Sequence, residues 1–320
     1  MIWGTVSGAS MVGMVISLLL SVVLPIFLGI FIYKKTKAWV PAFFIGCGIF
    51  VGFAMILEQI CHAIVLTVTG SAIRDNIWLY AIYGTPAESL CGLAAALFEE
   101  CGRWIAMKFC LKKHLTRENA LMYGAGHGGI EAFLILGMSS MSNLLTAAMI
   151  NGGLMEKTMT ALEPAQQEVT YHQLSVLWTT PAYQFYLAPV ERISAIALQI
   201  ALSILVYSAV KTGRKLHLAA AFGLHFAVDF LTVVCASTIP TWALELGLLM
   251  VVAVICARPA EIPRTFPWAS TEATAGLLLL HWKSSGSSSV TVLLSFDSAI
   301  TGAIFCVSPT LTVCVHAVIV

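Results

Sequence analysis

The chain has 320 residues, of which 59% are hydrophobic and only 10% are charged. Soluble domains carry about 25% charged residues, so this composition excludes an ordinary soluble domain and favours a polytopic α-helical membrane protein. The formal net charge is +1, and the basic residues are spread along the chain instead of forming one patch. We therefore expect the lipid bilayer as a partner and no nucleic acid.

Seven apolar stretches are long enough to span a bilayer, which takes about 20 residues. They cover residues 10–33, 39–66, 86–111, 120–147, 188–210, 216–236 and 241–257. Clusters of basic residues follow the first, third, fifth and seventh stretches: Lys34, Lys35, Lys37, Lys112, Lys113, Arg117, Lys211, Arg214, Lys215, Arg258 and Arg264. The positive-inside rule then predicts a multi-pass protein of the plasma membrane with its N-terminus outside and its basic loops in the cytoplasm.

Two parts of the chain differ from these stretches. Residues 1–258 are predicted to form the transmembrane helical domain, whereas residues 259–320 are rich in Ser and Thr and have no charged side chain after Asp297. We expect this tail to be an eighth apolar span near 290–320 or a disordered segment. The outside loop 148–187 is predicted to be either an interfacial helix or lid, or a simple connector.

Two adjacent glutamates, Glu99 and Glu100, lie inside the third apolar stretch, and Arg103 follows within one helical turn. A charge at the bilayer centre costs roughly 2.5–3.5 kcal/mol on insertion scales, so such residues indicate a functional site. Arg103 can neutralise one glutamate and leave the other free for chemistry. Because the two glutamates lie about 100° apart on a helix, we expect only one to point at the other site residues and the second to pair with Arg103.

Polar residues on four stretches fall at one depth. A helix rises about 1.5 Å per residue, so the distance from the basic loops places Glu100, His127, Gln199 and His225 about 15–18 Å inside the bilayer. Polar side chains also join membrane helices by hydrogen bonds. That packing role does not require two histidines, two glutamates and an arginine in one layer, so we interpret the layer as a site.

Each histidine has a carboxylate four residues later, Glu131 after His127 and Asp229 after His225. This spacing puts each pair on one helix face. A carboxylate fixes the tautomer of an imidazole and raises its basicity, whether the ring binds a metal or carries a proton. The predicted catalytic residues are Glu99, Glu100, Arg103, His127, Glu131, His225 and Asp229.

The glycines around His127, from Gly124 to Gly129, formally match GxGxxG, but no strand precedes them, so they do not indicate a dinucleotide site. Small residues instead predict close helix packing beside His127. Farther out, Glu58 and His62 share one helix face, and Arg192 lies at a similar level. We expect an ion pair between Glu58 and Arg192; the alternative is that this group extends the catalytic cavity.

These motifs together resemble the YhfC family of bacterial membrane proteins. The matching segments are Glu99-Glu-Cys-Gly-Arg103, Gly124-Ala-Gly-His-Gly-Gly-Ile-Glu131, Glu191-Arg192, His225-Phe-Ala-Val-Asp229 and Glu58-Gln-Ile-Cys-His62, within residues 10–257. The family is grouped with the CAAX-prenyl-protease/bacteriocin-processing and PrsW-type intramembrane peptidases. The resemblance implies a peptidase-like site at Glu99 or Glu100, His127 and His225. Gln199 stands where the family pattern has a histidine, which puts the completeness of that site in question.

The preferred hypothesis is hydrolysis of peptide bonds in membrane-embedded or membrane-associated substrates, with Glu100 or Glu99 activating a water molecule. In a zinc enzyme His127, His225 and Glu100 would hold the ion; a metal-free glutamate mechanism with the same residues is equally open. A non-catalytic scaffold or immunity protein on a peptidase fold is one alternative. A proton-coupled transporter is another, because intramembrane Glu, His and Asp residues also build proton relays.

Overall fold

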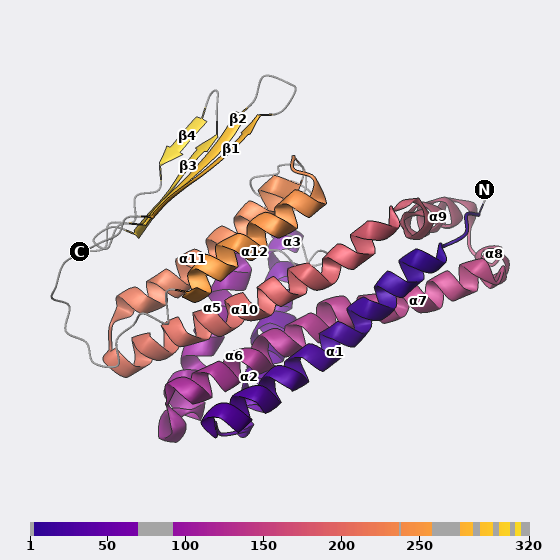
Figure 1. Cartoon of the computed structure of the whole chain (residues 1–320). Helices are drawn as coiled ribbons and strands as arrows, with labels where there is room; N and C mark the ends of the chain where they lie inside the picture. The colour runs from indigo at the N-terminus through magenta and orange to yellow at the C-terminus, as the bar shows by residue number, and fades with distance from the viewer. Residues whose placement is uncertain are drawn as a thin grey trace. The chain divides into compact units, whose positions relative to one another are not determined.

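The computed structural model describes residues 3–69, 92–236 and 238–257, and four strands between residues 276 and 314. The chain divides into two compact units at residues 262 and 263. The first unit is all-α (Figure 1). Its helices in chain order are α1 (Gly8–Thr36), α2 (Pro41–Phe50), α3 (Gln59–Thr69), α5 (Gly92–Ile105), α6 (Arg117–Ala132), α7 (Met138–Asn151), α8 (Leu154–Met159), α9 (Pro164–Thr179), α10 (Ala182–Thr212), α11 (Lys215–Ala236) and α12 (Thr241–Ala257).

Short π-helical and 3₁₀ segments join several of these helices. Segment η1 (Val51–Glu58) links α2 to α3, and η5 (Phe133–Gly137) links α6 to α7, so that each set forms one long helix. Segments η3 (Ala106–Cys110) and η4 (Lys112–His114) follow α5.

Within the described residues, five helices are long and apolar enough to cross a membrane: Gly8–Thr36, Pro41–Ile64, Arg117–Asn151, Ala182–Thr212 and Lys215–Ala236. They correspond to five of the seven predicted spans, and the all-α membrane class is confirmed. The predicted third span is represented by α5 and η3, and its first residues, 86–91, lie outside the described residues. The seventh is the shorter apolar helix α12. The count of seven therefore stays a prediction.

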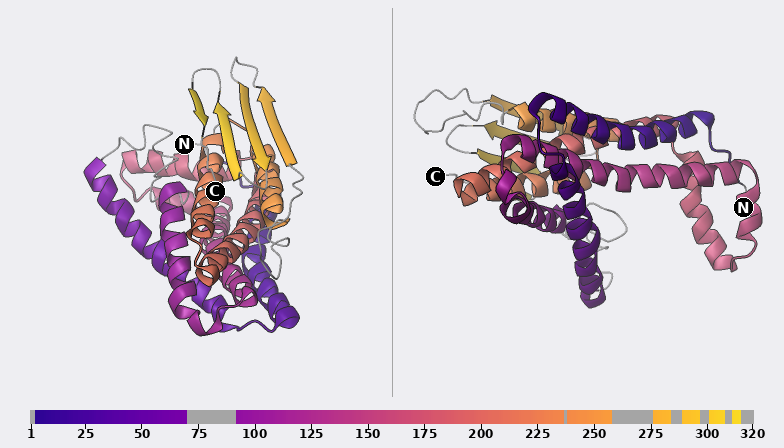
Figure 2. Two further views of the ribbon diagram at one scale, coloured as in Figure 1. Left: turned by 90° about the vertical axis from the view of Figure 1, so that its left-hand side faces the viewer. Right: turned by 90° about the horizontal axis from the view of Figure 1, so that it is seen from below.

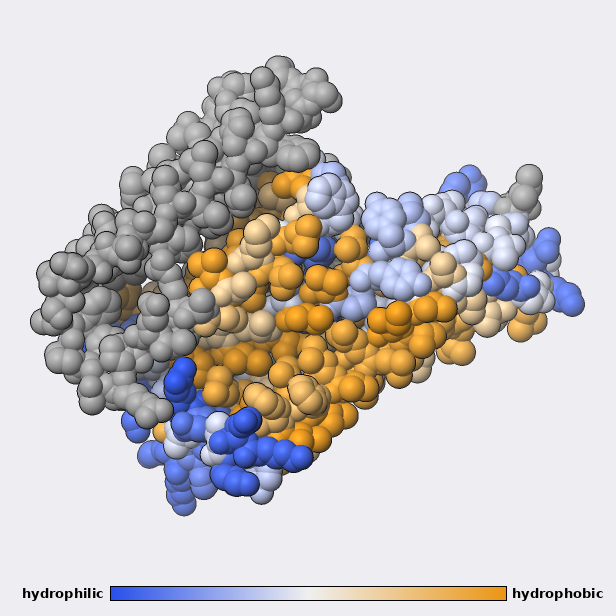
Figure 3. All heavy atoms as spheres, in the orientation of Figure 1, coloured by the Kyte–Doolittle hydropathy of each residue, from blue (hydrophilic) through white to orange (hydrophobic). Residues whose placement is uncertain are grey.

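Helix α1 shows the inverted pattern of a membrane helix. Its buried residues Ser10, Gly13, Ser17, Ser21 and Pro25 recur every three or four positions, which puts them on one face. The opposite face exposes large apolar side chains, which contribute to the broad apolar surface in Figure 3. Small residues on the inner face let helices approach closely, while lipid tails can solvate the apolar face.

Helix α6 is the centre of the unit and packs against α1, α2 and α10. A Cβ added at Gly126 would overlap the Phe43 carbonyl of α2, and one at Gly128 would lie 3.0 Å from the Ile196 Cα of α10. The glycine-rich face of α6 thus allows backbone-to-backbone contact on two sides, and the predicted close packing around His127 is confirmed. This packing brings three helices to within reach of one histidine.

Three basic loops lie at one end of the unit, where α1, η3 and α10 end (Figures 1 and 2). Asn119 ties two of these loops together: its side-chain oxygen accepts from the Trp39 amide at 2.7 Å, and its nitrogen donates to the His114 carbonyl at 2.6 Å. Trp39 also stacks on the His114 ring, with 4.1 Å between the centroids. At the opposite end, α8 and α9 form a hairpin beside the N-terminal segment, and Trp3 contacts Tyr171 and Trp178 of α9.

The second unit contains an antiparallel sheet in the order β1 (Gly276–Lys283), β2 (Ser289–Phe296), β3 (Thr301–Val307) and β4 (Leu311–Cys314). Leu280 pairs with Val292, which pairs with Phe305. Strands β2, β3 and β4 contain Val, Thr and Ile, whose β-branched side chains favour strands. The prediction for the segment 259–320 as a whole, one more apolar span or a disordered tail, stays a prediction.

Candidate active site

Helix α5 carries the two glutamates and Arg103 into the interior, where all three side chains are buried. Gly102 lets α5 approach η1, because a Cβ there would lie 2.7 Å from the Phe53 ring. Helix α11 packs along another part of α5. The glutamates therefore lie among several helices and not against lipid.

Glu99 is the most connected carboxylate of the site. Its Oε2 atom lies 2.9 Å from His127 Nε2 and 3.9 Å from His225 Nε2. Gln199 Nε2 donates to the same oxygen at 2.9 Å. One carboxylate oxygen thus lies between two imidazoles from different helices, α6 and α11, and the predicted meeting of these residues is found in the structure.

Glu100 lies against the other side of His225. Its Oε1 atom accepts from His225 Nδ1 at 2.8 Å. The second ring nitrogen lies 3.4 Å from Asp229 Oδ2, so the predicted His225–Asp229 pair is formed. Because an ionised carboxylate only accepts hydrogen bonds, Glu100 places a proton on Nδ1 and turns Nε2 towards Glu99 and Asp229.

The expectation that only one glutamate meets the histidines is wrong. Glu99 contacts His127 and Glu100 contacts His225, because α6 and α11 approach α5 from different directions. Arg103 Nε lies 3.2 Å from Glu100 Oε2, and its Nη2 lies 4.0 Å from Glu99 Oε2. Arg103 is therefore close to both glutamates. It does not pair with one glutamate and leave the other without a cationic neighbour.

Gln199 connects the parts of the site. Its amide nitrogen donates to Glu99 and, at 2.8 Å, to Glu131 Oε2, and its amide oxygen accepts from Arg103. Arg103 also donates to the Gln199 carbonyl and to Ser203 Oγ, each at 2.7 Å. A neutral amide both donates and accepts, whereas an imidazole has only two nitrogens for these three partners. Gln199 is thus an integral part of this layer, a role that the depth count alone did not indicate.

The expected Glu58–Arg192 ion pair is corrected. Arg192 Nη1 lies 3.1 Å from Glu131 Oε1, and Arg192 also contacts Glu191. Glu58 instead lies 3.1 Å from His62 Nε2 and is close enough to Glu99 to interact with it electrostatically. Arg192 lies on the face of α10 that is turned towards α6. Its contact with Glu131 extends the buried polar layer outward.

Two contacts of His127 are not visible as sequence motifs. Tyr123 lies one turn earlier on α6, with its hydroxyl 3.5 Å from His127 Nδ1. Phe50 of α2 packs its ring edge-on, 5.2 Å from the imidazole. His127 is 0% exposed, so these rings fix its orientation and leave Nε2 for Glu99. The i,i+4 spacing of Tyr123 and His127 is the only sequence signal for this arrangement.

The π-helical segments lie next to site residues. Segment η1 ends at Glu58, η3 begins three residues after Arg103, and η5 begins two residues after Glu131. π-Helical bulges change the rotational phase of a helix and are frequent at functional sites.

The residues contain the ligand types of a catalytic zinc site, two imidazoles and a carboxylate. As placed, however, no group of three His, Cys, Asp or Glu side chains in the described part of the chain could hold a metal ion. Glu99 bonds directly to His127, and His225 is directed to Glu100 and Asp229. The donor atoms are thus paired with each other, and this arrangement does not fit a metal ion.

The described residues contain five helices long and apolar enough to cross a membrane, and a buried layer of His, Glu and Arg side chains, which together define a multi-pass membrane protein with an internal polar site. The model of the family described as "YhfC intramembrane metalloprotease" matches residues 20–255. The uncharacterized membrane protein YhfC of Bacillus subtilis (strain 168) is 40% identical over 229 residues, which are 69% of this chain and 83% of that protein. The chain belongs to the YhfC family, and the resemblance is confirmed. No solved structure matches the chain.

Proposed function

We propose that this protein hydrolyses peptide bonds of membrane-associated substrates at the buried layer, with Glu99 as the general base. The observation that carries the proposal is the position of Glu99 Oε2, 2.9 Å from His127 Nε2 and 3.9 Å from His225 Nε2. The family's description as an intramembrane metalloprotease supports a protease. Hydrolysis needs a base that accepts a proton from water and an acid that protonates the leaving amine. Glu99 and the two histidines, His127 and His225, include candidates for both roles.

Glu99 suits the role of base better than Glu100. Glu100 is only 1% exposed and is engaged on both oxygens, by His225 Nδ1 at 2.8 Å and Arg103 Nε at 3.2 Å. The contacts of Glu99 gather on one oxygen, Oε2, which leaves Oε1 as the acceptor for a water proton. We therefore assign water activation to Glu99 and a positioning role to Glu100.

His225 is proposed to protonate the leaving amine. Three carboxylates, Glu99, Glu100 and Asp229, lie within 4 Å of its ring nitrogens and stabilise a positive charge there. His127, held by Tyr123 and Phe50, would orient Glu99 through the contact of its Nε2 atom with Glu99 Oε2. Gln199 holds Glu99 by a hydrogen bond of 2.9 Å, and Arg103 holds Glu100 by an ion pair of 3.2 Å.

The test is cleavage by the purified protein in lipid nanodiscs of a peptide mixture prepared from bacterial membranes, with new termini identified by mass spectrometry. Removing a general base costs about 10²–10⁴-fold in rate, so we expect that loss in kcat for Glu99→Gln. Glu100→Gln should lose less, because it removes positioning and not the base. Cys101→Ser is the matched control, since Cys101 is exposed on the same helix. Cleavage that survives Glu99→Gln would contradict the proposal and favour a non-catalytic role.

Metal dependence is tested separately. Because the donor atoms are engaged with each other, we expect cleavage to survive dialysis against a chelator, and the purified protein to contain less than one zinc ion per chain. Inductively coupled plasma mass spectrometry checks the metal content. One zinc ion per chain that is lost in His127→Ala would show that the glutamate–histidine contacts open to admit a metal.

A further inference from the structure

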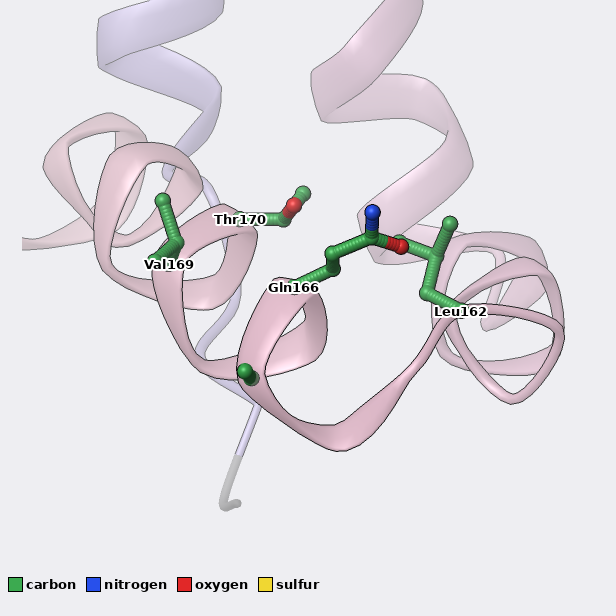
Figure 4. A pocket seen from close by; sticks show the side chains of 5 residues that line it. Leu162, Gln166, Val169 and Thr170 are labelled. Carbon is green, nitrogen blue, oxygen red and sulfur yellow. The ribbon is translucent and has the colours of Figure 1, made fainter.

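A groove of about 430 Å³ lies between α1, α7, α9 and α10, and its lining includes no residue of the buried layer. Its volume falls within the range of about 300–1,000 Å³ typical of ligand sites. A second hollow of about 500 Å³ lies along α9 and the turn before it, where Gln166 and Thr170 are its polar side chains (Figure 4). That hollow is lined by one short stretch of chain, whereas the groove is built by four helices.

The lining of the groove is uncharged. It combines apolar side chains with hydroxyl groups and three side-chain amides, those of Asn143, Gln173 and Gln184, and it includes no Lys, Arg, Asp, Glu or His. An amide side chain offers a donor and an acceptor, the same pair that a peptide group presents. A phosphate headgroup would instead require basic side chains.

Several of these polar groups have no hydrogen-bond partner in the part of the chain that the structure describes. Ser140 is only 4% exposed, yet its hydroxyl makes no hydrogen bond among the described residues. The side chains of Asn143 and Gln184 likewise bond to no described group, although both are half-buried. The amides of Asn143 and Gln184 are therefore open to hydrogen bonds with a molecule that lies in the groove.

The groove ends close to the buried layer. Leu136 at its inner end is five residues beyond Glu131 on the α6–η5 helix, and Ala188 is four residues before Arg192 on α10. One helical turn rises about 5.4 Å. Glu131 and Arg192 contact each other, and Gln199 bridges Glu131 to Glu99. Polar side chains of the protein therefore form a series of contacts from the groove to Glu99, the proposed base.

We propose that this groove binds an extended, uncharged stretch of the polypeptide substrate and delivers the adjoining peptide bond to Glu99; this inference rests on the proposed function. An extended chain has unpaired amide groups, and their transfer into an apolar environment is unfavourable unless they find hydrogen-bond partners there. The free amides of Asn143 and Gln184 offer those bonds along the path to the buried layer.

The first experiment measures kcat and KM on the peptide that the wild-type protein cleaves best. Loss of one neutral hydrogen bond in a buried site weakens binding by about tenfold, so Asn143→Leu and Gln184→Leu should each raise KM by that factor and leave kcat nearly unchanged. Ser140→Ala, which barely changes the volume, should raise KM less. Controls are Ser142→Leu and Tyr183→Leu, exposed neighbours outside the groove.

The second experiment does not depend on turnover. Fluorescence anisotropy measures binding of a fluorescein-labelled nonapeptide of Ala, Ser, Thr and Val to the Glu99→Gln variant in nanodiscs. Binding that weakens about tenfold with Asn143→Leu or Gln184→Leu, but not with the controls, supports the groove even where no cleavage is found. An unchanged KM and unchanged anisotropy in the folded groove variants overturn it while leaving the proposed function intact. Displacement of the peptide by uncharged lipid alone, without an effect of the variants, also overturns it.

Discussion

At the residue scale, the site is a chain of complementary partners and not a set of isolated charges. Arg103, which is 0% exposed, holds Glu100 through its Nε atom and Gln199 through two nitrogens. Replacing one member of such a buried network leaves its partners desolvated and unpaired. The most informative single residue is therefore the neutral one, Gln199, whose removal leaves the number of charges unchanged.

We expect Gln199→Leu to destabilise the protein by about 3 kcal/mol or more, because hydrogen bonds to charged groups contribute about 1.5–3 kcal/mol each. The midpoint of thermal denaturation in detergent should fall, and kcat should drop at least tenfold as Glu99 loses its donor. Ser203→Ala is the control: it removes one hydrogen bond to a charged group and Arg103 keeps the Gln199 carbonyl at 2.7 Å, so the loss should be smaller, about 1.5 kcal/mol. Equal losses in both variants would show that Gln199 does not bridge the carboxylates.

The members of this layer could be predicted from the sequence, but their pairing could not. The number of residues between a side chain and the nearest basic loop gives its depth in the bilayer. This count predicted one common layer for Glu100, His127, Gln199 and His225. The partner of each residue depends instead on how its helix is rotated about its axis and on which side the neighbours approach. For that reason the Glu58–Arg192 pair was predicted wrongly. Of the two His–carboxylate pairs expected from i,i+4 spacing, His225–Asp229 is formed. His127 instead contacts Glu99, and Glu131 contacts Arg192 and Gln199.

At the element scale, the approach of α2 to α6 sets the position of His127. A Cβ at Gly46 would overlap the Tyr123 carbonyl, and one at Gly126 would overlap the Phe43 carbonyl. The contact is therefore backbone against backbone, and it brings the Phe50 ring to His127. The glycine run in the sequence predicted close packing; which glycine faces which helix follows from the crossing geometry.

We expect Gly126→Ala to push α2 and α6 apart, at a cost of about 1–3 kcal/mol for overpacking, and to lower activity because His127 is the next residue. Gly48→Ala is the matched control on α2, since nothing lies within 4 Å of a Cβ there. An alanine in an open helix position should instead stabilise by about 0.5–1 kcal/mol. Thermal denaturation in detergent distinguishes the two, and a neutral Gly126→Ala would mean that the helices separate more easily than the contact distances imply.

At the scale of the whole molecule, the two ends of the helical unit differ in charge and structure. One end gathers the loops after α1, η3 and α10, where the basic clusters lie. The other end carries the α8–α9 hairpin, which packs on the N-terminal segment through Trp3. The sequence predicted either an interfacial helix or lid, or a simple connector, for the segment 148–187. This segment contains the two helices α8 and α9. Gln173 of α9 lines the groove.

This asymmetry gives a test of orientation. Basic loops are retained in the cytoplasm, so we expect the α8–α9 turn and the N-terminus to face outside. In a variant with its nine cysteines replaced by serine or alanine, a membrane-impermeant maleimide should label Glu163→Cys in intact cells. The same reagent should label Lys35→Cys only after the membrane is permeabilised. Labelling in the reverse order would place the groove on the cytoplasmic side, so that substrates would have to approach from within the cell.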